Sequence, residues 1–456
     1  MDDSSSRPQW HRSIFGHEFF APAQWRRRAV LWTGGVLVGL AAIAFARASD
    51  LAFQMFRHML GWSSWLPVLL TPATFAVLAW LTRGVLEPAR GSGIPQVIAA
   101  INVEDPGFRD RLLSLPVSLG KIALTLLGLL GGASIGREGP TVHIGAGLMY
   151  WIGRRFAFTD PKAISRFVLA GGGAGIAAAF NTPLAGVVFA IEELAGTYEH
   201  RFSGIILTAV IFAGMVSLGL LGDYAYFGHV ATELPLREAW LAVIACGLIG
   251  GLAGGAFVRA ILLSDRGPLA RIAALRQRAP ILFAAGCGLA LAGLGLVSAN
   301  TVYGTGYEQA RSLIQSAHGE ATAFGAFKLC ANIISYWAGI PGGIFSPALA
   351  VGAGIGQMIA WLLSSAHSSA VVLLGMAGFL AGVTQTPITA AVISFELTAN
   401  HSMIIPIMAV SLLARGISSL VSPTPVYRAF ADRLIAQFEH GRDASSASQH
   451  ESPSVR

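Results

Sequence analysis

The residues GREGP at positions 136–140 place an arginine and a glutamate inside a long apolar stretch of the chain. Proline is favoured in the first turn of a helix, where its missing N–H would have no partner in any case. The free N–H groups of such a helix start form a positive end that attracts anions. The carboxylate of Glu138 can occupy this end, and a mobile anion can displace it. The simpler alternative is that Glu138 only stabilises the start of its helix.

Two further helix starts of the same kind are GSGIP at 91–95 and GIFSP at 343–347. Each combines glycine, a serine hydroxyl and a proline. Backbone N–H groups and a hydroxyl can bind an anion without a fixed counter-charge, so the anion can leave again. Three such starts in one chain predict helix dipoles that converge on one anion pathway.

The chain also contains an internal repeat. Two landmarks occur twice at a nearly constant offset. At an offset of 207 residues, GREGP followed by Gly145-Ala146-Gly147 matches GIFSP followed by Gly352-Ala353-Gly354. At an offset of 204 residues, Thr182-Pro183 with Glu192 matches Thr386-Pro387 with Glu396. The repeat predicts two related halves, about 30–225 and 235–425. It makes Glu192 and Glu396 equivalent, so we interpret both as structural. The residues alone leave open whether the halves are parallel or inverted.

Composition assigns this chain of 456 residues to the membrane. It is 54% hydrophobic and 12% charged, against roughly 25% charged in soluble domains. These values exclude a water-soluble enzyme and a disordered chain. The long apolar segments rule against the short alternating strands of a β-barrel. They lie at about 29–48, 65–86, 112–136, 167–194, 202–222, 239–263, 279–299, 323–340, 345–363, 370–397 and 402–421.

The net charge of +7 does not indicate nucleic-acid binding, because the basic residues gather at segment ends. Arg26, Arg27 and Arg28 precede the first apolar segment, which places the N-terminus in the cytoplasm by the positive-inside rule. We expect that segment to be a retained helix and not a signal peptide. The three cysteines lie in apolar segments, where we expect them to be buried, and their spacing fits no metal site. No nucleotide-binding loop supports ATP-driven transport.

Charged residues inside the apolar segments are candidates for function, because a charge at the bilayer centre costs at least ~2.5 kcal/mol. The acidic ones are Glu138, Glu192, Glu193 and Glu396, and the basic ones are Lys121, Arg137 and Lys328.

The three motifs, in this order and spacing, resemble those of the CLC family of chloride channels and proton-coupled chloride antiporters. Pro425-Val426-Tyr427 is similar to the segment that carries the family's pore tyrosine, and the resemblance covers about residues 30–430. It implies an all-α integral membrane protein with two inverted-topology repeats of tilted and broken helices. It also implies a homodimer with one pore per subunit.

The predicted organisation is a cytoplasmic N-terminal segment at 1–28, a single transmembrane domain at 29–430, and a short cytoplasmic polar tail at 431–456 without a regulatory domain. We expect a multi-pass protein of the inner (cell) membrane, with both termini in the cytoplasm and no cofactor.

The resemblance also implies roles for individual residues. Ser92 and Tyr427 would donate hydroxyls to a central chloride, and the amides of Ile344 and Phe345 would complete that site. Glu138 would be the external gate and proton acceptor. It would compete with chloride for an outer anion site beside Arg137 and Gly139. A serine at position 92 goes with chloride in the family, where proline goes with nitrate, and the fluoride-exporting branch departs from the first two motifs.

Glu193 would be the internal proton relay, as in proton-coupled members of the family. The alternative for Glu193 is a structural ion pair, with Lys121 as the candidate partner. This chain has Gln96, Ile98 and Asn102 where relatives often carry acidic residues. The sequence therefore predicts a proton-coupled chloride antiporter, with a passive voltage- or proton-gated chloride channel as the alternative.

Two other interpretations concern the segment around GREGP. His143 could sense pH, because imidazole titrates near neutrality, or it could be a hydrogen-bonded histidine inside the bundle. Gly132-Ala133-Ser134-Ile135-Gly136 matches the GxSxG pattern of serine hydrolases, with His143 as a possible base. That pattern requires a strand-to-helix turn, which an all-α membrane protein does not provide, so we do not expect an enzyme.

Overall fold

The computed structural model describes residues 22–84, 86–156, 160–196, 203–222, 225–228, 234–262, 269–315, 323–365 and 367–450. Within these residues the secondary structure is helical, apart from one isolated bridge between Gly136 and Gly343. Eight helices of the described part are long and apolar enough to cross a membrane. The prediction of an all-α membrane fold is confirmed.

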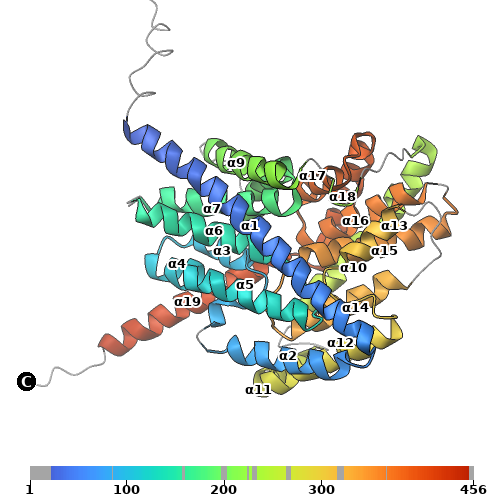
Figure 1. The fold of residues 1–456 in the computed structure, drawn as a ribbon, viewed down its shortest axis with the longest axis horizontal. Helices are drawn as coiled ribbons and strands as arrows, with labels where there is room; N and C mark the ends of the chain where they lie inside the picture. Colours follow the sequence, from blue (N-terminus) through green and yellow to red (C-terminus); the bar gives the residue numbers. More distant parts are fainter. Residues whose placement is uncertain are drawn as a thin grey trace, which may run out of the picture.

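The helices of the first half are α1 (Pro22–Trp62), α2 (Pro67–Leu81), η2 (Glu87–Ala89), α3 (Ile94–Asn102), α4 (Pro106–Leu113), α5 (Leu115–Leu130), α6 (Glu138–Arg155), α7 (Pro161–Phe180), α8 (Pro183–Phe189), the π-helical turn η3 (Ala190–Ala195) and α9 (Ser203–Leu221). Those of the second half are α10 (Leu236–Ile261), α11 (Ala270–Arg278), α12 (Pro280–Val297), α13 (Tyr307–Gln315), α14 (Phe324–Trp337), α15 (Phe345–Leu362), α16 (Ser368–Thr384), α17 (Pro387–Thr398), η4 (His401–Met403), α18 (Ile404–Val421) and α19 (Val426–His450). In Figure 1, α1 runs obliquely across the first half, where it packs against α5, α6, α7 and α9.

Helix breaks fall at equivalent places in the two halves. Asn181 ends α7 and Gln385 ends α16, and each adopts a left-handed conformation with φ of 58°. A Thr-Pro pair follows each of them and starts the next helix. The apolar segments predicted at 167–194 and 370–397 are therefore each divided into separate helices, because their sequences carry a turn that hydrophobicity alone does not reveal.

Carboxylates from each half hold helix starts of the other half. Glu192 accepts hydrogen bonds from two backbone N–H groups at the start of α17, at 3.2 and 2.6 Å. Glu396 accepts two from the start of α8, also at 3.2 and 2.6 Å. The donors are Ile388 and Thr389 toward Glu192, and Leu184 and Ala185 toward Glu396. This reciprocity is that of two repeats related by a two-fold axis, and it gives both glutamates the structural role that the repeat predicts.

Small residues allow close packing within each half. A Cβ added at Gly145 of α6 would lie 2.3 Å from the carbonyl oxygen of Gly171 on α7. A Cβ added at Gly352 of α15 would lie 2.6 Å from that of Gly375 on α16. Membrane helices pack by such backbone approach, since lipid provides little hydrophobic drive between them. The two helix pairs that carry GREGP and GIFSP are thus fixed in the same way.

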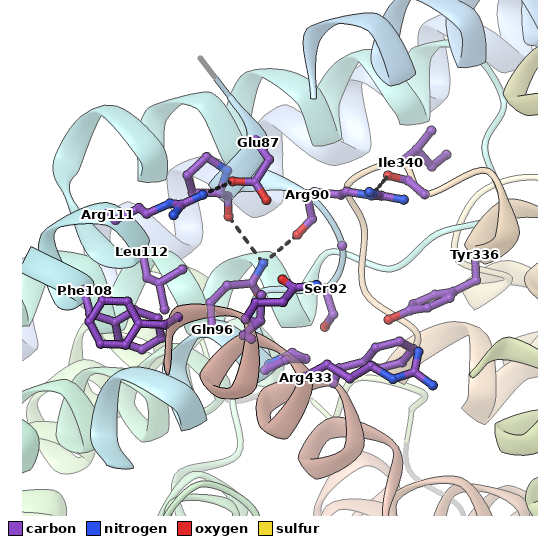
Figure 2. A pocket seen from close by; sticks show the side chains of 18 of the residues that line it. Glu87, Arg90, Ser92, Gln96, Phe108, Arg111, Leu112, Tyr336, Ile340 and Arg433 are labelled. Atoms are coloured by element: carbon purple, nitrogen blue, oxygen red, sulfur yellow. Dashed lines mark hydrogen bonds and ion pairs between the residues drawn. The ribbon is translucent and has the colours of Figure 1, made fainter. Parts of the chain in front are cut away.

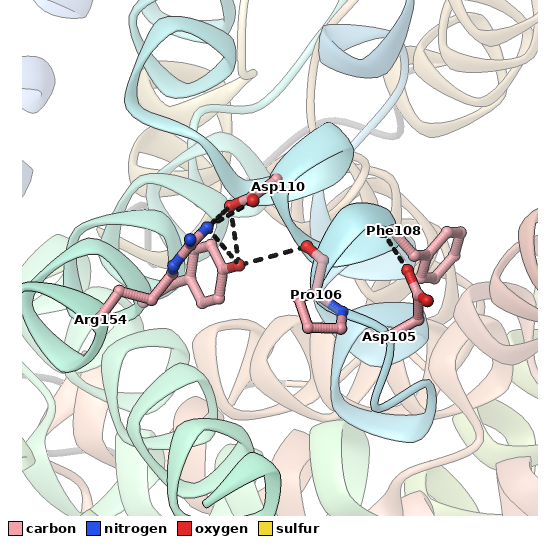
Figure 3. Close-up of polar contacts among 6 residues, drawn as sticks. Asp105, Pro106, Phe108, Asp110 and Arg154 are labelled. Carbon is pink, nitrogen blue, oxygen red and sulfur yellow. Dashed lines mark hydrogen bonds and ion pairs between the residues drawn. The ribbon is translucent and has the colours of Figure 1, made fainter. Parts of the chain in front are cut away.

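The far end of α6 is fastened to the short helix α4 (Figure 3). Asp105 caps α4 by accepting a hydrogen bond from the N–H of Phe108 at 2.7 Å. Asp110 of α4 forms an ion pair with Arg154 and accepts a hydrogen bond from the hydroxyl of Tyr150 at 2.8 Å. Both partners lie in the last turns of α6, so α4 fixes the helix that begins at Glu138.

Residues 431–450 of the predicted polar tail belong to α19, and the end of this helix projects from the bundle (Figure 1). The prediction that all three cysteines are buried needs one correction. Cys246 and Cys287 are buried as expected, but Cys330 is exposed. Apolar neighbours in sequence do not imply burial in a membrane protein, because lipid-facing side chains are apolar too.

The reciprocal carboxylates give a test of the fold. We expect Glu192→Gln and Glu396→Gln each to lower the stability of the protein by about 1–2 kcal/mol, because a glutamine side chain has one acceptor oxygen for two backbone donors. The measurement is the thermal unfolding midpoint in detergent. Glu308→Gln, which changes an exposed ion pair with Arg57, is the matched control and should shift it little. A lower unfolding midpoint in one of the two variants and an unchanged one in the other would contradict the equivalence of Glu192 and Glu396.

Candidate functional site

The starts of α6 and α15 are joined backbone to backbone. The N–H of Gly136 donates to the carbonyl of Gly343 at 2.7 Å, and the N–H of Gly343 donates to that of Gly136 at 2.7 Å. The two exchanged bonds form the isolated antiparallel bridge of the structure. They hold GREGP and GIFSP, one from each half, face to face.

The third helix start joins the same cluster. Gly91 and Gly93 have φ of 70° and 105°, which turns the chain sharply before α3. The carbonyl of Gly91 accepts a hydrogen bond from the N–H of Gly342 at 3.2 Å. A Cβ added at Gly139 would lie 2.2 Å from the Oγ of Ser92, so these two residues are in direct contact. The structure thus brings together all three segments that the sequence predicts to converge.

Two buried hydroxyls lie in this cluster. Ser92 and Tyr427 are each 1% exposed and lie within interaction range of each other, and neither hydroxyl oxygen has a partner elsewhere in the described part of the chain. Tyr427 lies at the start of α19, within electrostatic range of Glu138 and Glu193. An unpaired buried hydroxyl costs about 1–3 kcal/mol. A halide that accepts a hydrogen bond from both hydroxyls would remove this cost.

The carboxylate of Glu138 lies at the start of α15. Its Oε2 accepts a hydrogen bond from the N–H of Ser346 at 3.4 Å, and its Oε1 has no partner in the described residues. Ile344 is the N-cap residue and Phe345 the first residue of α15, and both are buried. The first N–H groups of a helix have no acceptor within the helix. Glu138 therefore occupies a position where an anion would bind.

The guanidinium of Arg137 is bonded to α1. Its guanidinium donates to the carbonyl of Ala46 at 2.8 Å and pairs with Asp50 at 2.5 Å. Arg137, Asp50 and Tyr226 line a cavity of about 440 Å³. The sequence prediction missed Asp50, because it ended the first apolar segment at residue 48, whereas α1 continues to Trp62.

Glu193 lies in the π-helical turn η3 and is 2% exposed. It accepts a hydrogen bond from the hydroxyl of Thr386 at 3.1 Å, and its charged neighbours are Glu192 and Arg428. Lys121, the partner considered from the sequence, instead donates to the carbonyls of Arg90 and Gly91 at 3.2 and 3.0 Å. Lys121 therefore supports the loop that carries Ser92, and it forms no ion pair with Glu193.

The residues of the hydrolase interpretation are not paired with each other. The hydroxyl of Ser134 donates to Asn332 and accepts from Lys328, both at 2.8 Å. His143 is fully buried, and its Nε2 lies 2.9 Å from the carbonyl oxygen of Leu112. Each side chain has a structural partner on another element, and no serine–histidine pair is formed.

Comparisons with known proteins bear on the family and the fold. The family model for voltage gated chloride channels matches residues 74–419. Among solved structures, a slow cyanobacterial Cl−/H+ antiporter has a TM-score of 0.76 at 22% identity, over 90% of this chain and 97% of its own. A CLC-type fluoride/proton antiporter has a TM-score of 0.75 at 21% identity, and the match covers 90% of this chain and 98% of that one. A eukaryotic CLC transporter has a TM-score of 0.72 at 22% identity, and the match covers 90% of this chain and 74% of that one. At these identities the likeness establishes the fold, and with the family match it follows that the chain is a multi-pass membrane protein that belongs to the voltage gated chloride channel, or CLC, family.

Proposed function

We propose that this protein is a proton-coupled chloride antiporter in which Glu138 is the external gate. The observation that carries the proposal is the position of the Glu138 carboxylate, which is buried and bonded to a backbone N–H group at the start of α15. A carboxylate that shares the amides of an anion site competes with the anion for them. This competition lets one side chain respond to both ions.

The coupling follows from the charge of this carboxylate. When Glu138 is ionised, it is attracted to the positive end of α15 and blocks the outer anion position. When it is protonated, that attraction is lost, and chloride takes the amides that the carboxylate leaves. The proton then departs on the outer side as chloride moves inward, so the two ions travel in opposite directions. Arg137 and Gly139 line the outer position in this proposal.

The central chloride site consists of the hydroxyls of Ser92 and Tyr427 and the amides of Ile344 and Phe345. Apart from each other, the two hydroxyls have no partner among the described residues, so both are free to donate to an anion. A site of neutral donors binds an anion weakly enough to release it. Chloride is the anion we propose, because Ser92 takes the place that proline holds in nitrate-preferring members of the family.

Glu193 is the internal proton relay in this proposal. It is buried, no cation of the described residues is bonded to it, and it shares Tyr427 with Glu138 as an electrostatic neighbour. A carboxylate in such a position can take up a proton away from the anion path and pass it toward Glu138. Water between the two carboxylates would complete the route.

A passive chloride channel of the same fold is the second candidate. It is favoured by Gln96, which fills a position where relatives often have an acidic residue. Its amide donates to the carbonyls of Pro88 and Arg90 at 3.3 and 2.6 Å. Gln96 therefore cannot carry a proton into the protein from that side.

We also propose a homodimer in the cell membrane, with one pore in each subunit and both termini in the cytoplasm. Helices α9, α17 and α18 expose large apolar side chains, among them Met215, Ile388 and Ile405. Such a face requires lipid or a second copy of the chain as its neighbour.

Vesicles containing the purified protein test the main proposal. A chloride gradient should drive protons against their own gradient, measured as a pH change in a weakly buffered bath. Glu138→Ala should reduce proton movement to background while chloride efflux, followed with a chloride electrode, continues, because the gate and its titratable group are both removed. Chloride flux without proton movement in the unaltered protein would instead establish the channel.

The relay has a matched pair of variants. Glu193→Gln should abolish proton movement and leave chloride flux, because the amide cannot carry a proton. Glu192→Gln changes the neighbouring carboxylate, which caps α17, and should leave the coupling intact. Full coupling in Glu193→Gln would remove Glu193 from the proton route.

The preference between nitrate and chloride tests the role of Ser92 in the central site. Ser92→Pro should raise nitrate flux relative to chloride flux several-fold, because it removes a hydroxyl donor beside Tyr427. The measurement is the reversal potential, or the ratio of initial efflux rates, with the two anions. An unchanged ratio would show that Ser92 does not take part in anion selection.

A further inference from the structure

A second cavity, of about 470 Å³, lies at the mouth of the cluster that carries Ser92 (Figure 2). Its walls come from the loop before α3 and from α3, α4, α11, α14 and α19. Ser92 and Gly91 belong to its lining, so the cavity borders the proposed chloride site. The cavity of Asp50 and Arg137 shares none of these residues.

The lining is strongly basic. Its arginines are Arg90, Arg111, Arg276 and Arg433, and Glu87 is the acidic side chain among the described lining residues. Glu87 is bonded to Arg111 at 3.1 Å. The other three guanidinium groups have no carboxylate within ion-pair distance in the described part of the chain. The cavity therefore holds an excess of three positive charges.

The three guanidinium groups without a carboxylate partner lie near Tyr336. Arg90 also donates through its Nε to the carbonyl of Gly339 at 3.2 Å. A Cβ added at Gly339 would lie 2.5 Å from an Nη of Arg90 and 3.0 Å from an Nη of Arg276. Arg433 shares with them the electrostatic neighbourhood of Tyr336, whose side chain extends into the cavity (Figure 2). Like charges held this close repel each other unless an anion lies between them. Planar guanidinium groups match the oxygen atoms of a phosphate particularly well.

Four aromatic rings also line the walls. Tyr336 and Phe430 have ring centroids 5.3 Å apart, and Phe108 and Phe438 have centroids 4.5 Å apart. All four rings line the cavity. Pockets for small organic ligands have volumes of about 300–1,000 Å³, and a monatomic anion needs a small part of that. The size and the rings indicate a ligand with a flat ring system in addition to its charge.

We propose that this cavity binds a nucleoside polyphosphate, which closes the anion path from the side of α19. The phosphates lie between Arg90, Arg276 and Arg433, and the base lies against the aromatic walls. The bound nucleotide covers Ser92 and blocks entry of the transported anion. The block rests on the proposed transport function, whereas the binding does not.

Binding is measured first, with purified full-length protein in detergent and ATP or pyrophosphate as the ligand, by calorimetry. Removing both Arg276 and Arg433 (R276Q with R433Q) should weaken ATP binding at least tenfold, since each provides a charge-assisted hydrogen bond. The matched control is Arg47→Gln, which removes a charge from the opposite cavity and should bind as the unaltered protein does. A symmetric elution profile shows that each variant is folded.

Vesicles then test the block. ATP on the side of α19 should reduce chloride flux in the unaltered protein and in Arg47→Gln, and should leave the double variant unaffected. Absence of ATP binding, or equal binding to the double variant, overturns the proposal. Flux that depends on phosphatidylglycerol content and not on ATP also overturns it, and assigns the arginines to a lipid headgroup. If ATP binds but no proton-coupled flux exists, the proposed function fails and the binding site stands.

Discussion

The pair of hydrogen bonds between Gly136 and Gly343 is the constraint on which the site depends. It joins the two halves at the point where their helices begin, so the positive ends of α6 and α15 lie next to each other. Two positive helix ends in apolar surroundings repel, and a negative group between them relieves that repulsion. Glu138 provides such a group, and its bond to the N–H of Ser346 crosses from one half to the other.

Much of this arrangement could be predicted from the sequence, because it depends on motifs with a local physical meaning. Glycine and proline in GREGP and GIFSP specify helix starts wherever they occur, and their repetition specifies the symmetry. The fold was predictable for the same reason. The directions of long side chains were not. The guanidinium of Arg137 turns to Asp50 on α1, and Lys121 turns to backbone carbonyls, because partners far along the chain decide these orientations.

The two cavities differ in whether their arginines are paired with carboxylates. On one side, Arg137 is neutralised by Asp50, so the space beside Glu138 carries a paired cation. In the other cavity, Arg90, Arg276 and Arg433 have no carboxylate within ion-pair distance among the described residues, and all three are electrostatic neighbours of Tyr336. The electrostatic potential that an anion experiences therefore differs between the two cavities. Arg90, Arg276 and Arg433 belong to no recognisable motif, so the basic cavity could not be predicted from the sequence.

The exchanged carboxylates, Glu192 on the start of α17 and Glu396 on the start of α8, bear on how such a chain arose. Each half is left with an unmet acceptor and two unmet donors when it stands by itself. Two identical half-length polypeptides, inserted into the bilayer in opposite orientations, would satisfy one another through this same exchange. Gene duplication and fusion would then have preserved a contact that an ancestral pair of separate chains already needed.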